Sequence, residues 1–221
     1  MDKKEESPYR LNLTRSGTHA LLVVEVPAHS RVLEIGSATG YMGEYLIKKK
    51  GCKVWGVEPV AKWHAEAMER GYESVSPLGA EAYLETLPKT EQFDCVLLAD
   101  VLEHMPDPEK TLRALRQYCA PDGRLVISLP NIAHYSTRWG LLMGKWDMTD
   151  WGILDRTHLH FYTKKTAEEM IRQAGYEIEK CRPAAGYIET WGTWFFSIGK
   201  RLLFAWPEFF APQFIFVARP R

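Results

Sequence analysis

Short apolar segments alternate with longer segments of helical spacing along residues 31–130. The apolar run FDCVLLAD (93–100) is typical of a strand that is buried on both faces. Two of the helical segments end at Gly51 and Gly71, where glycine commonly terminates a helix. This alternation predicts a parallel sheet that is covered by helices on both faces. The expected strands are 31–36, 52–59, 73–77, 93–100 and 124–130, and the expected helices are 18–26, 40–51, 61–71, 80–87 and 108–120.

The chain is less regular after residue 130. Residues 131–162 mix aromatic residues, histidines and glycines without a clean period. A helix is expected over 163–175, and late strands are expected over 176–181 and 213–219. The expected helix N-caps are Ser16 or Thr18, Asp107 followed by Pro108, and Thr163 or a Thr166/Glu169 capping box.

An aromatic helix is expected at roughly 189–206, where apolar residues recur at helical spacing. Packing of this stripe against the sheet is the simplest interpretation. The alternatives are a lid over an apolar acceptor, a homodimer contact, or contact with a membrane surface through Lys200 and Arg201. The residues of the stripe are Trp191, Phe195, Ile198, Leu202 and Trp206.

Composition limits the class of protein and its partners. The 221 residues are enough for a single domain, and 28 basic and 28 acidic residues give a formal net charge of zero. No global charge therefore favours binding to nucleic acid. The N-terminal residues lack the apolar core of a signal peptide, and no apolar run reaches the roughly 18 residues of a membrane span. The four cysteines form no CxxC pair and are expected to be reduced thiols, so a cytoplasmic enzyme is expected.

The segment RVLEIGSATGYMG (31–43) predicts a ligand-binding loop between a strand and a helix. It is not a dinucleotide fingerprint, because GxGxxG would need glycine where Ala38 and Tyr41 stand, and it lacks the GKS or GKT of a P-loop. A carboxylate at Glu58, which closes the next expected strand, could accept both hydroxyls of a ribose. A nucleoside without phosphates, S-adenosylmethionine (SAM), suits this arrangement. A tight turn that happens to contain two glycines is the alternative.

These segments resemble the class I SAM-dependent methyltransferases over nearly the whole chain. VLEIGSATGYMGEYL (32–46) is similar to the first motif of that family, and VWGVEP (54–59) is similar to the second. FDCVLLADVLEHMPDPEKTL (93–112) resembles the D-V-L-E-H-x-x-D-P signature of one large bacterial branch. Segments 123–135 and 154–179 are similar to further parts of the same branch.

The resemblance implies an α/β fold, a Rossmann-like three-layer sandwich. Its seven-stranded sheet would be mostly parallel, with an antiparallel last strand. The resemblance also implies SAM as the cofactor and S-adenosylhomocysteine as its product. Residues 1–221 would form a single methyltransferase domain, with 1–30 as an N-terminal helical leader and with 131–162 and 186–212 as insertions or a lid on the acceptor side.

The resemblance further implies the residues that hold the cofactor. Gly36, Ser37 and Gly40 would line the methionine end, Glu34 would support the loop, Glu58 would hold the ribose, Pro59 would pack near the adenine, and Asp100 and Val101 would flank the cofactor. Ala38 stands where relatives often have glycine, a change that a methyl group can survive. Ala80 stands where relatives often have an aspartate for the adenine amino group, so a backbone carbonyl, Glu81 or apolar contact would replace it.

Methyl transfer to a hydroxyl needs a base as well as an aligned acceptor. Three histidines are candidates, namely His104 after the fourth core strand and the alternating pair His158 and His160, which would point to one face of an extended segment. Each has a plainer interpretation, as a loop residue or as part of the polar wall of an acceptor pocket. The His-x-His pair with Asp155 and Glu103 could instead bind a divalent metal, but nothing in the sequence fixes a ligand geometry, and no metal is expected.

The expected function is methyl transfer from SAM to a small-molecule or sugar acceptor, most simply to a hydroxyl. N-methylation of a small amine and a catalytically silent SAM-binding module remain as alternatives. A nicotinamide oxidoreductase is disfavoured by the missing GxGxxG. A DNA amino-methyltransferase is disfavoured because ADVLEH (99–104) replaces the Asn/Asp-Pro-Pro-aromatic motif of that branch.

Overall fold

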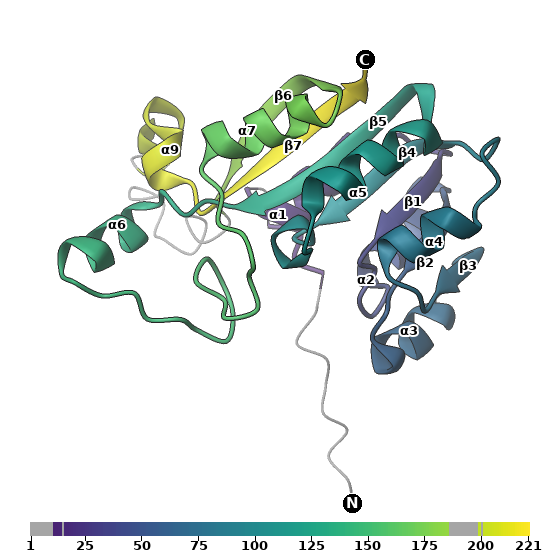
Figure 1. Cartoon of the computed structure of the whole chain (residues 1–221), viewed down its shortest axis with the longest axis horizontal. Helices are drawn as coiled ribbons and strands as arrows, with labels where there is room; N and C mark the ends of the chain where they lie inside the picture. Colours follow the sequence, from purple (N-terminus) through teal and green to yellow (C-terminus); the bar gives the residue numbers. More distant parts are fainter. Residues whose placement is uncertain (1–10, 15, 186–198, 200) are drawn as a thin grey trace, which may run out of the picture.

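A seven-stranded sheet with the order β3-β2-β1-β4-β5-β7-β6 forms the centre of the protein (Figure 1). The computed structural model describes residues 11–14, 16–185, 199 and 201–221. The strands are β1 (Arg31–Ile35), β2 (Lys53–Val57), β3 (Ser74–Ser76), β4 (Phe93–Ala99), β5 (Cys119–Pro130), β6 (Tyr176–Ala184) and β7 (Gln213–Pro220). The helices are α1 (Thr18–Glu25), α2 (Tyr41–Lys50), α3 (Ala61–Met68), α4 (Ala80–Thr86), α5 (Pro108–Leu115), α6 (Tyr135–Leu142), α7 (Lys164–Gln173) and α9 (Pro207–Phe210), with short 3₁₀ helices η1 (Leu102–His104) and η2 (Arg116–Tyr118).

The direction of the strands confirms the predicted fold class. The neighbours among β3, β2, β1, β4 and β5 pair in parallel, whereas β7 is antiparallel to both β5 and β6. The carboxyl ends of the parallel strands therefore share one edge of the sheet, where open α/β sheets bind their ligands.

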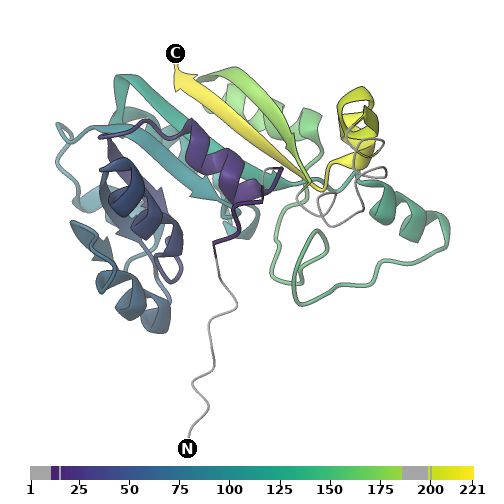
Figure 2. The ribbon, with the colours of Figure 1, turned by 180° about the vertical axis from the view of Figure 1, so that it is seen from behind.

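Alternation along the strands divides the core into two layers. In β1, Val32 packs with the cluster that contains Leu22 and Leu46, whereas Leu33 packs with the cluster that contains Leu112 and Ile171. The first cluster fixes α1 and α2 to one face, on which Figure 2 shows α1 lying in front of the sheet. The second cluster fixes α4, α5 and α7 to the other face (Figure 1). The result is the predicted three-layer sandwich.

Several predicted boundaries are wrong for local reasons. The N-cap of α1 is Gly17, not Ser16 or Thr18, and it makes no side-chain cap. The helix that begins at Asp107 and Pro108 ends at Leu115 rather than at 120, because Cys119 already pairs with Phe93 as the first residue of β5. At α7, Thr163 caps the helix with Thr166 as its capping-box partner, so the alternative box with Glu169 is excluded.

The segment 131–162 contains a helix that the irregular sequence did not predict. Helix α6 follows β5, and α6, α9 and the chain between α6 and α7 lie beyond the carboxyl end of β5 (Figure 1). Many of the large apolar side chains of segment 131–162 are exposed. This explains why apolar residues do not recur there at the spacing of a buried helix face. The exposed residues are Tyr135, Trp139, Leu141, Leu142, Met143, Trp146, Trp151, Leu159 and Phe161.

Most of the predicted aromatic helix lies outside the described residues. Trp191, Phe195, Ile198 and Lys200 are among these, and so is most of the stripe. Of the described members, Leu202 is 43% exposed and Trp206 is 54% exposed, so the prediction that they pack in the core is wrong.

Two further expectations concern thiols and membrane spans. Cys52, Cys95 and Cys119 are buried and Cys181 is half-buried, and all four are free thiols, as predicted. Among the described residues, no helix combines the length and the apolar character needed to cross a bilayer.

Candidate functional site

The loop between β1 and α2 has a backbone that few side chains permit. Gly36 and Gly40 adopt left-handed φ values of 73° and 77°. A Cβ atom on Gly36 would lie 2.5 Å from Cγ2 of Val101, so this glycine also allows the loop to touch the segment after β4. Gly36 and Ser37 donate their backbone N–H groups to the carbonyl oxygen of Val57, at 2.8 and 3.1 Å. The predicted loop is thus fixed between the ends of β2 and β4.

Ala38 adopts a left-handed φ of 47°, which an alanine occupies at a cost. Replacing it with glycine relieves about 1–2 kcal/mol of backbone strain and returns about 0.5–1 kcal/mol in lost chain entropy. We therefore expect Ala38→Gly to leave the free energy of unfolding unchanged or to raise it by up to about 1 kcal/mol. Gly36→Ala is the opposite test, and urea denaturation should show a clear loss of stability. Equal stability for the two variants would contradict the described loop backbone.

Two hydroxyl groups in the loop are buried without a hydrogen-bond partner. Ser37 is 1% exposed and Thr39 is fully buried, and neither side-chain oxygen has a partner among the described residues. Buried polar atoms are nearly always satisfied in folded proteins. Orphaned hydroxyls next to positive-φ glycines therefore fit a loop that receives a polar ligand.

Glu58 joins the end of β2 to this loop. Its side chain is buried; Oε2 accepts the backbone N–H of Ala38 at 2.8 Å, and Oε1 accepts that of Val60 at 2.9 Å. Each carboxylate oxygen has a second lone pair, so both remain able to accept a hydroxyl. The two backbone contacts fix the orientation of the carboxylate that would hold a ribose.

Glu34 lies under the loop in a pocket closed by Tyr72. The phenol of Tyr72 donates to Oε2 of Glu34 at 2.6 Å, and its ring occupies the space that side chains at Gly43 and Gly56 would fill. Burial raises the pKa of Glu34 to about 7, the Tyr72 hydrogen bond opposes that rise, and the nearby Glu58 adds to it. The hydrogen bond from Tyr72 thus fixes the buried carboxyl group of Glu34, and the support of the loop by Glu34 stays a prediction.

The pKa of Glu34 predicts a dependence of stability on pH. The unfolded chain releases this proton near the ordinary pKa of 4.5, whereas the folded chain holds it to about 7, so stability falls as pH rises between these values. The shift corresponds to about 3 kcal/mol. Glu34→Gln keeps an oxygen for Tyr72 and removes the titration, so its free energy of unfolding should fall about 3 kcal/mol less than that of the wild type between about pH 5 and about pH 8. If urea denaturation showed the same change of the free energy of unfolding with pH in the wild type and in Glu34→Gln, the raised pKa of Glu34 would be refuted.

Asp100, at the end of β4, is held by two residues that the sequence analysis missed. Its backbone is left-handed, with φ 53°, and its carboxylate accepts the Ser128 hydroxyl at 2.6 Å and the Gln213 amide at 2.9 Å. Ser128 lies on β5 and Gln213 lies on the neighbouring antiparallel strand β7, and no local motif in the sequence connects them to Asp100. They were therefore not detectable from spacing alone.

The remaining predicted cofactor residues lie at the same edge. Val101 contacts Gly36, Pro59 is exposed just after β2, and Ala80 is the first residue of α4. Glu81, the predicted substitute for an adenine-binding aspartate, instead pairs with Lys110 at 2.6 Å. His19 of α1 was also missed by the sequence analysis. The centroid of its ring lies 5.2 Å from that of Tyr41, the residue directly after Gly40.

Two of the three candidate histidines converge, and the third does not. The rings of His104 and His158 lie 4.8 Å apart, and Nε2 of His158 is 4.0 Å from Oε1 of Glu103. His160 instead places Nε2 3.3 Å from the carbonyl oxygen of Pro106. The predicted shared face of His158 and His160 thus does not bring their functional atoms together.

The carboxyl group of Glu103 is buried in this cluster. Its side chain is 1% exposed, and neither oxygen accepts a hydrogen bond from any described residue. Burial, followed by the charge of Asp100, raises the pKa of Glu103 well above its ordinary value. Burial, followed by the neighbouring His104, lowers the pKa of His158. The cluster therefore joins a buried carboxyl group without a hydrogen-bond partner to an imidazole, that of His158, whose pKa is lowered.

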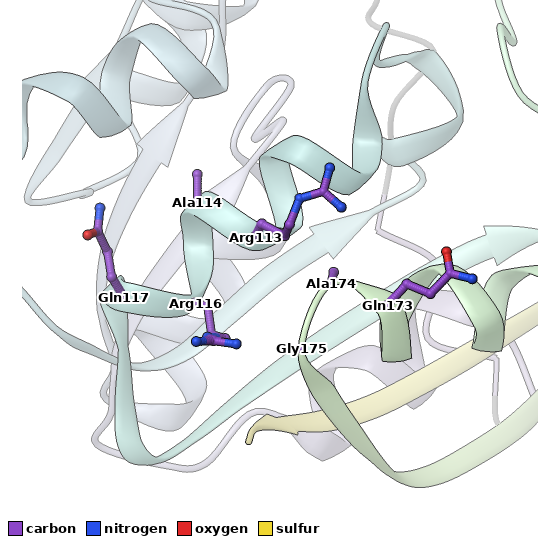
Figure 3. Close-up of a pocket in the computed structure, with 7 residues that line it drawn as sticks. All are labelled: Arg113, Ala114, Arg116, Gln117, Gln173, Ala174 and Gly175. Carbon is purple, nitrogen blue, oxygen red and sulfur yellow. The ribbon is translucent and has the colours of Figure 1, made fainter.

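A cavity elsewhere in the protein contains none of these residues. It lies beside the amino end of β5, between α5 and the turn before β6, which is the sheet edge opposite the glycine loop (Figure 3). Its lining residues are Arg113, Ala114, Arg116, Gln117, Gln173, Ala174 and Gly175. It is separate from the candidate site.

Comparison with known proteins identifies the family of this chain. Residues 9–180 match the family described as "Methyltransferase domain". The ubiquinone biosynthesis O-methyltransferase of Aeromonas salmonicida is 34% identical over 106 residues, which cover 46% of this chain and 43% of that relative. The chain thus spans less than half the length of the curated relatives it matches.

Solved structures share the fold at low sequence identity. A SAM-dependent methyltransferase from Thermotoga maritima has a TM-score of 0.63 and 18% identity, covering 93% of this chain and 88% of that chain. The 1,6-didemethyltoxoflavin-N1-methyltransferase of Burkholderia thailandensis, solved with 1,6-didemethyltoxoflavin and S-adenosylhomocysteine, has a TM-score of 0.60 and 17% identity, covering 95% and 79%. With a family match over more than half of its length, the chain belongs to the methyltransferase domain family.

Proposed function

We propose that this protein transfers a methyl group from SAM to a hydroxyl group of a small molecule or sugar. The observation that carries the proposal is the glycine loop, which places two orphaned hydroxyls beside a carboxylate already oriented by backbone N–H groups. The family match, the names of the relatives and the S-adenosylhomocysteine in the Burkholderia neighbour support SAM as the cofactor.

In this proposal, different residues of the site bind different parts of the cofactor. Gly36, Ser37, Ala38 and Gly40 bind its methionine end, where the unpartnered hydroxyls of the loop can hydrogen-bond to a carboxylate or an ammonium. Glu58 accepts the ribose hydroxyls. Pro59 and Ala80 pack near the adenine, and Asp100 and Val101 close the side toward β4.

The acceptor lies beside η1, on the side that α6 and residues 143–162 occupy. Segments from β4 and from 157–160 meet there, because the carbonyl oxygen of Glu103 accepts the N–H groups of Leu159 and His160. The many exposed apolar side chains of α6 and the following segment suit an acceptor that carries an apolar part. The relatives named as O-methyltransferases support a hydroxyl acceptor.

The chemistry needs little from the protein beyond alignment and the removal of one proton. When bound, SAM supplies the methyl group, which leaves its sulfonium sulfur in an in-line displacement as the acceptor oxygen bonds to it and the sulfur keeps the electron pair. His104 and His158 are the residues that can receive or direct the hydroxyl proton. The side chain of His160 places Nε2 3.3 Å from the carbonyl oxygen of Pro106 and does not join His104 and His158, so its proposed part is positional.

A screen for S-adenosylhomocysteine formation tests this function. Purified protein is incubated with SAM and with matched hydroxylated, aminated and carboxylated compounds, and the expected result is turnover that depends on a hydroxyl acceptor. Turnover with amines alone would replace the proposal with N-methylation. SAM binding without turnover on any acceptor class would favour a catalytically silent binding module.

A further inference from the structure

A compact group of metal-ligating side chains lies next to the proposed acceptor position. One ligand atom from each of Glu103, His104 and His158 lies within 4.8 Å of the other two. Ligand atoms around a tetrahedral ion lie roughly 3.4 Å apart at bond lengths of about 2.1 Å. Side-chain movements of about an ångström would therefore complete the three-residue coordination of an ion.

The hydrogen bonds of the two histidines determine which ring nitrogen of each is free to bind an ion. Nδ1 of His104 lies 3.2 Å from the carbonyl oxygen of Thr157 and 3.1 Å from its hydroxyl oxygen, and that hydroxyl already donates to Asp155. Nδ1 of His158 lies 3.2 Å from the carbonyl oxygen of Ile153. Because these partners accept, Nδ1 must carry the proton in both rings, which leaves Nε2 with the lone pair. A ring N–H that donates to a backbone carbonyl is the usual support of a metal-bound histidine.

Glu103 supplies a second and independent indication of a ligand. Its carboxyl group is almost fully buried, both oxygens lack a hydrogen-bond partner, and Oε1 lies 4.0 Å from Nε2 of His158. A buried carboxylate without a partner is strongly destabilising unless a cation compensates it. No Lys or Arg is paired with Glu103 among the described residues, so a bound cation would supply the missing partner of this carboxyl group.

We infer that Glu103, His104 and His158 bind one divalent transition-metal ion and leave coordination positions open to the acceptor. Two imidazoles and one carboxylate suit zinc, iron(II) or manganese(II) better than magnesium, which prefers oxygen ligands. His104 is exposed, so the open positions face solvent. Asp155 and His160, which the sequence analysis considered as ligands, lie outside the group, and Asp155 instead holds Thr157.

The ion would explain how the acceptor loses its proton, a consequence that rests on the proposed function. A hydroxyl bound at an open position becomes more acidic, as metal-bound water does. Its proton passes to solvent, the oxygen forms the new bond to the methyl carbon, and the bond from that carbon to sulfur breaks. Acceptors with two neighbouring oxygens, which can occupy two open positions, are the substrate class that this site favours.

Calorimetric titration of chelator-treated protein tests the site in the absence of SAM and acceptor. Zinc and manganese chlorides are each expected to bind at one ion per chain, with magnesium chloride much weaker. Glu103→Gln and His158→Gln are each expected to weaken zinc binding by about 100-fold or more, beyond the loss typical of residues that only support a ligand. His29→Asn is the control and should bind zinc like the wild type, because His29 is exposed and outside the group, and asparagine tolerates its positive φ of 57°.

Thermal unfolding distinguishes a variant that has lost metal binding from one that does not fold. In the presence of a chelator, the unfolding temperature of Glu103→Gln should equal or exceed that of the wild type, because the substitution removes a buried acid that has no partner. Added zinc should raise the unfolding temperature of the wild type but not of the variant. Absence of saturable binding, or equal zinc affinity in the wild type and Glu103→Gln, would overturn the metal site. Metal binding in a protein that does not bind SAM would overturn the proposed function alone.

Discussion

Glu58→Ala is expected to weaken the binding of S-adenosylhomocysteine by about 10- to 100-fold, because one or two hydrogen bonds to the ribose worth about 1–3 kcal/mol are lost. The variant should also be less stable, since the backbone N–H groups of Ala38 and Val60 lose their acceptor. Isothermal titration calorimetry measures the affinity, and urea denaturation measures the stability.

Glu73→Ala is the matched control for this substitution. Glu73 is an exposed carboxylate directly before β3, and its replacement should change neither quantity. A Glu58 variant that lost stability but kept full affinity would show that the carboxylate only braces the loop, and it would remove the ribose from this position.

His158→Ala is expected to lower the turnover number by about 10²- to 10⁴-fold, because the variant loses either the group that accepts the hydroxyl proton or a ligand of the ion that acidifies that hydroxyl. The affinity for S-adenosylhomocysteine should be unchanged, because His158 contacts Glu103, His104 and the carbonyl of Ile153 rather than the glycine loop. Steady-state kinetics with the acceptor found by screening, combined with calorimetry, separates the two effects.

The exposed His29 provides the control for His158, and His29→Asn should keep wild-type turnover. Unchanged turnover in His158→Ala would assign the proton to His104 or would mean that no protein base is needed. A loss of turnover accompanied by a similar loss of cofactor affinity would instead indicate that the 157–160 segment supports the loop.

The centre of the sheet was predictable because strands such as β1 and β4 are buried on both faces. Apolar runs such as 93–99 have few alternatives to a buried strand, and the structure confirmed the predicted start of α5 at Asp107 and Pro108. The glycine loop was also recognisable, since Gly36 and Gly40 occupy positive-φ positions that local spacing can indicate.

The rest of the site depends on contacts between distant segments. Tyr72 donates a hydrogen bond to Glu34, and Gln213 of the antiparallel strand β7 donates one to Asp100. Both pairs are distant in the sequence, so no local sequence pattern predicts either contact. Helix α6 was missed because its apolar residues face solvent and give no amphipathic period. The sequence suggested a metal only weakly for the same reason, since only the fold brings His158 to Glu103 and His104.

The central claim is that the loop between β1 and α2 holds the methionine end of SAM while Glu58 holds its ribose. A crystal structure of the protein with S-adenosylhomocysteine tests this claim most directly. The account predicts both ribose hydroxyls within hydrogen-bond distance of the Glu58 carboxylate and the amino-acid end against Gly36, Ser37 and Gly40. A nucleoside bound at another edge of the sheet, or a loop that stays empty at saturating ligand, would contradict it.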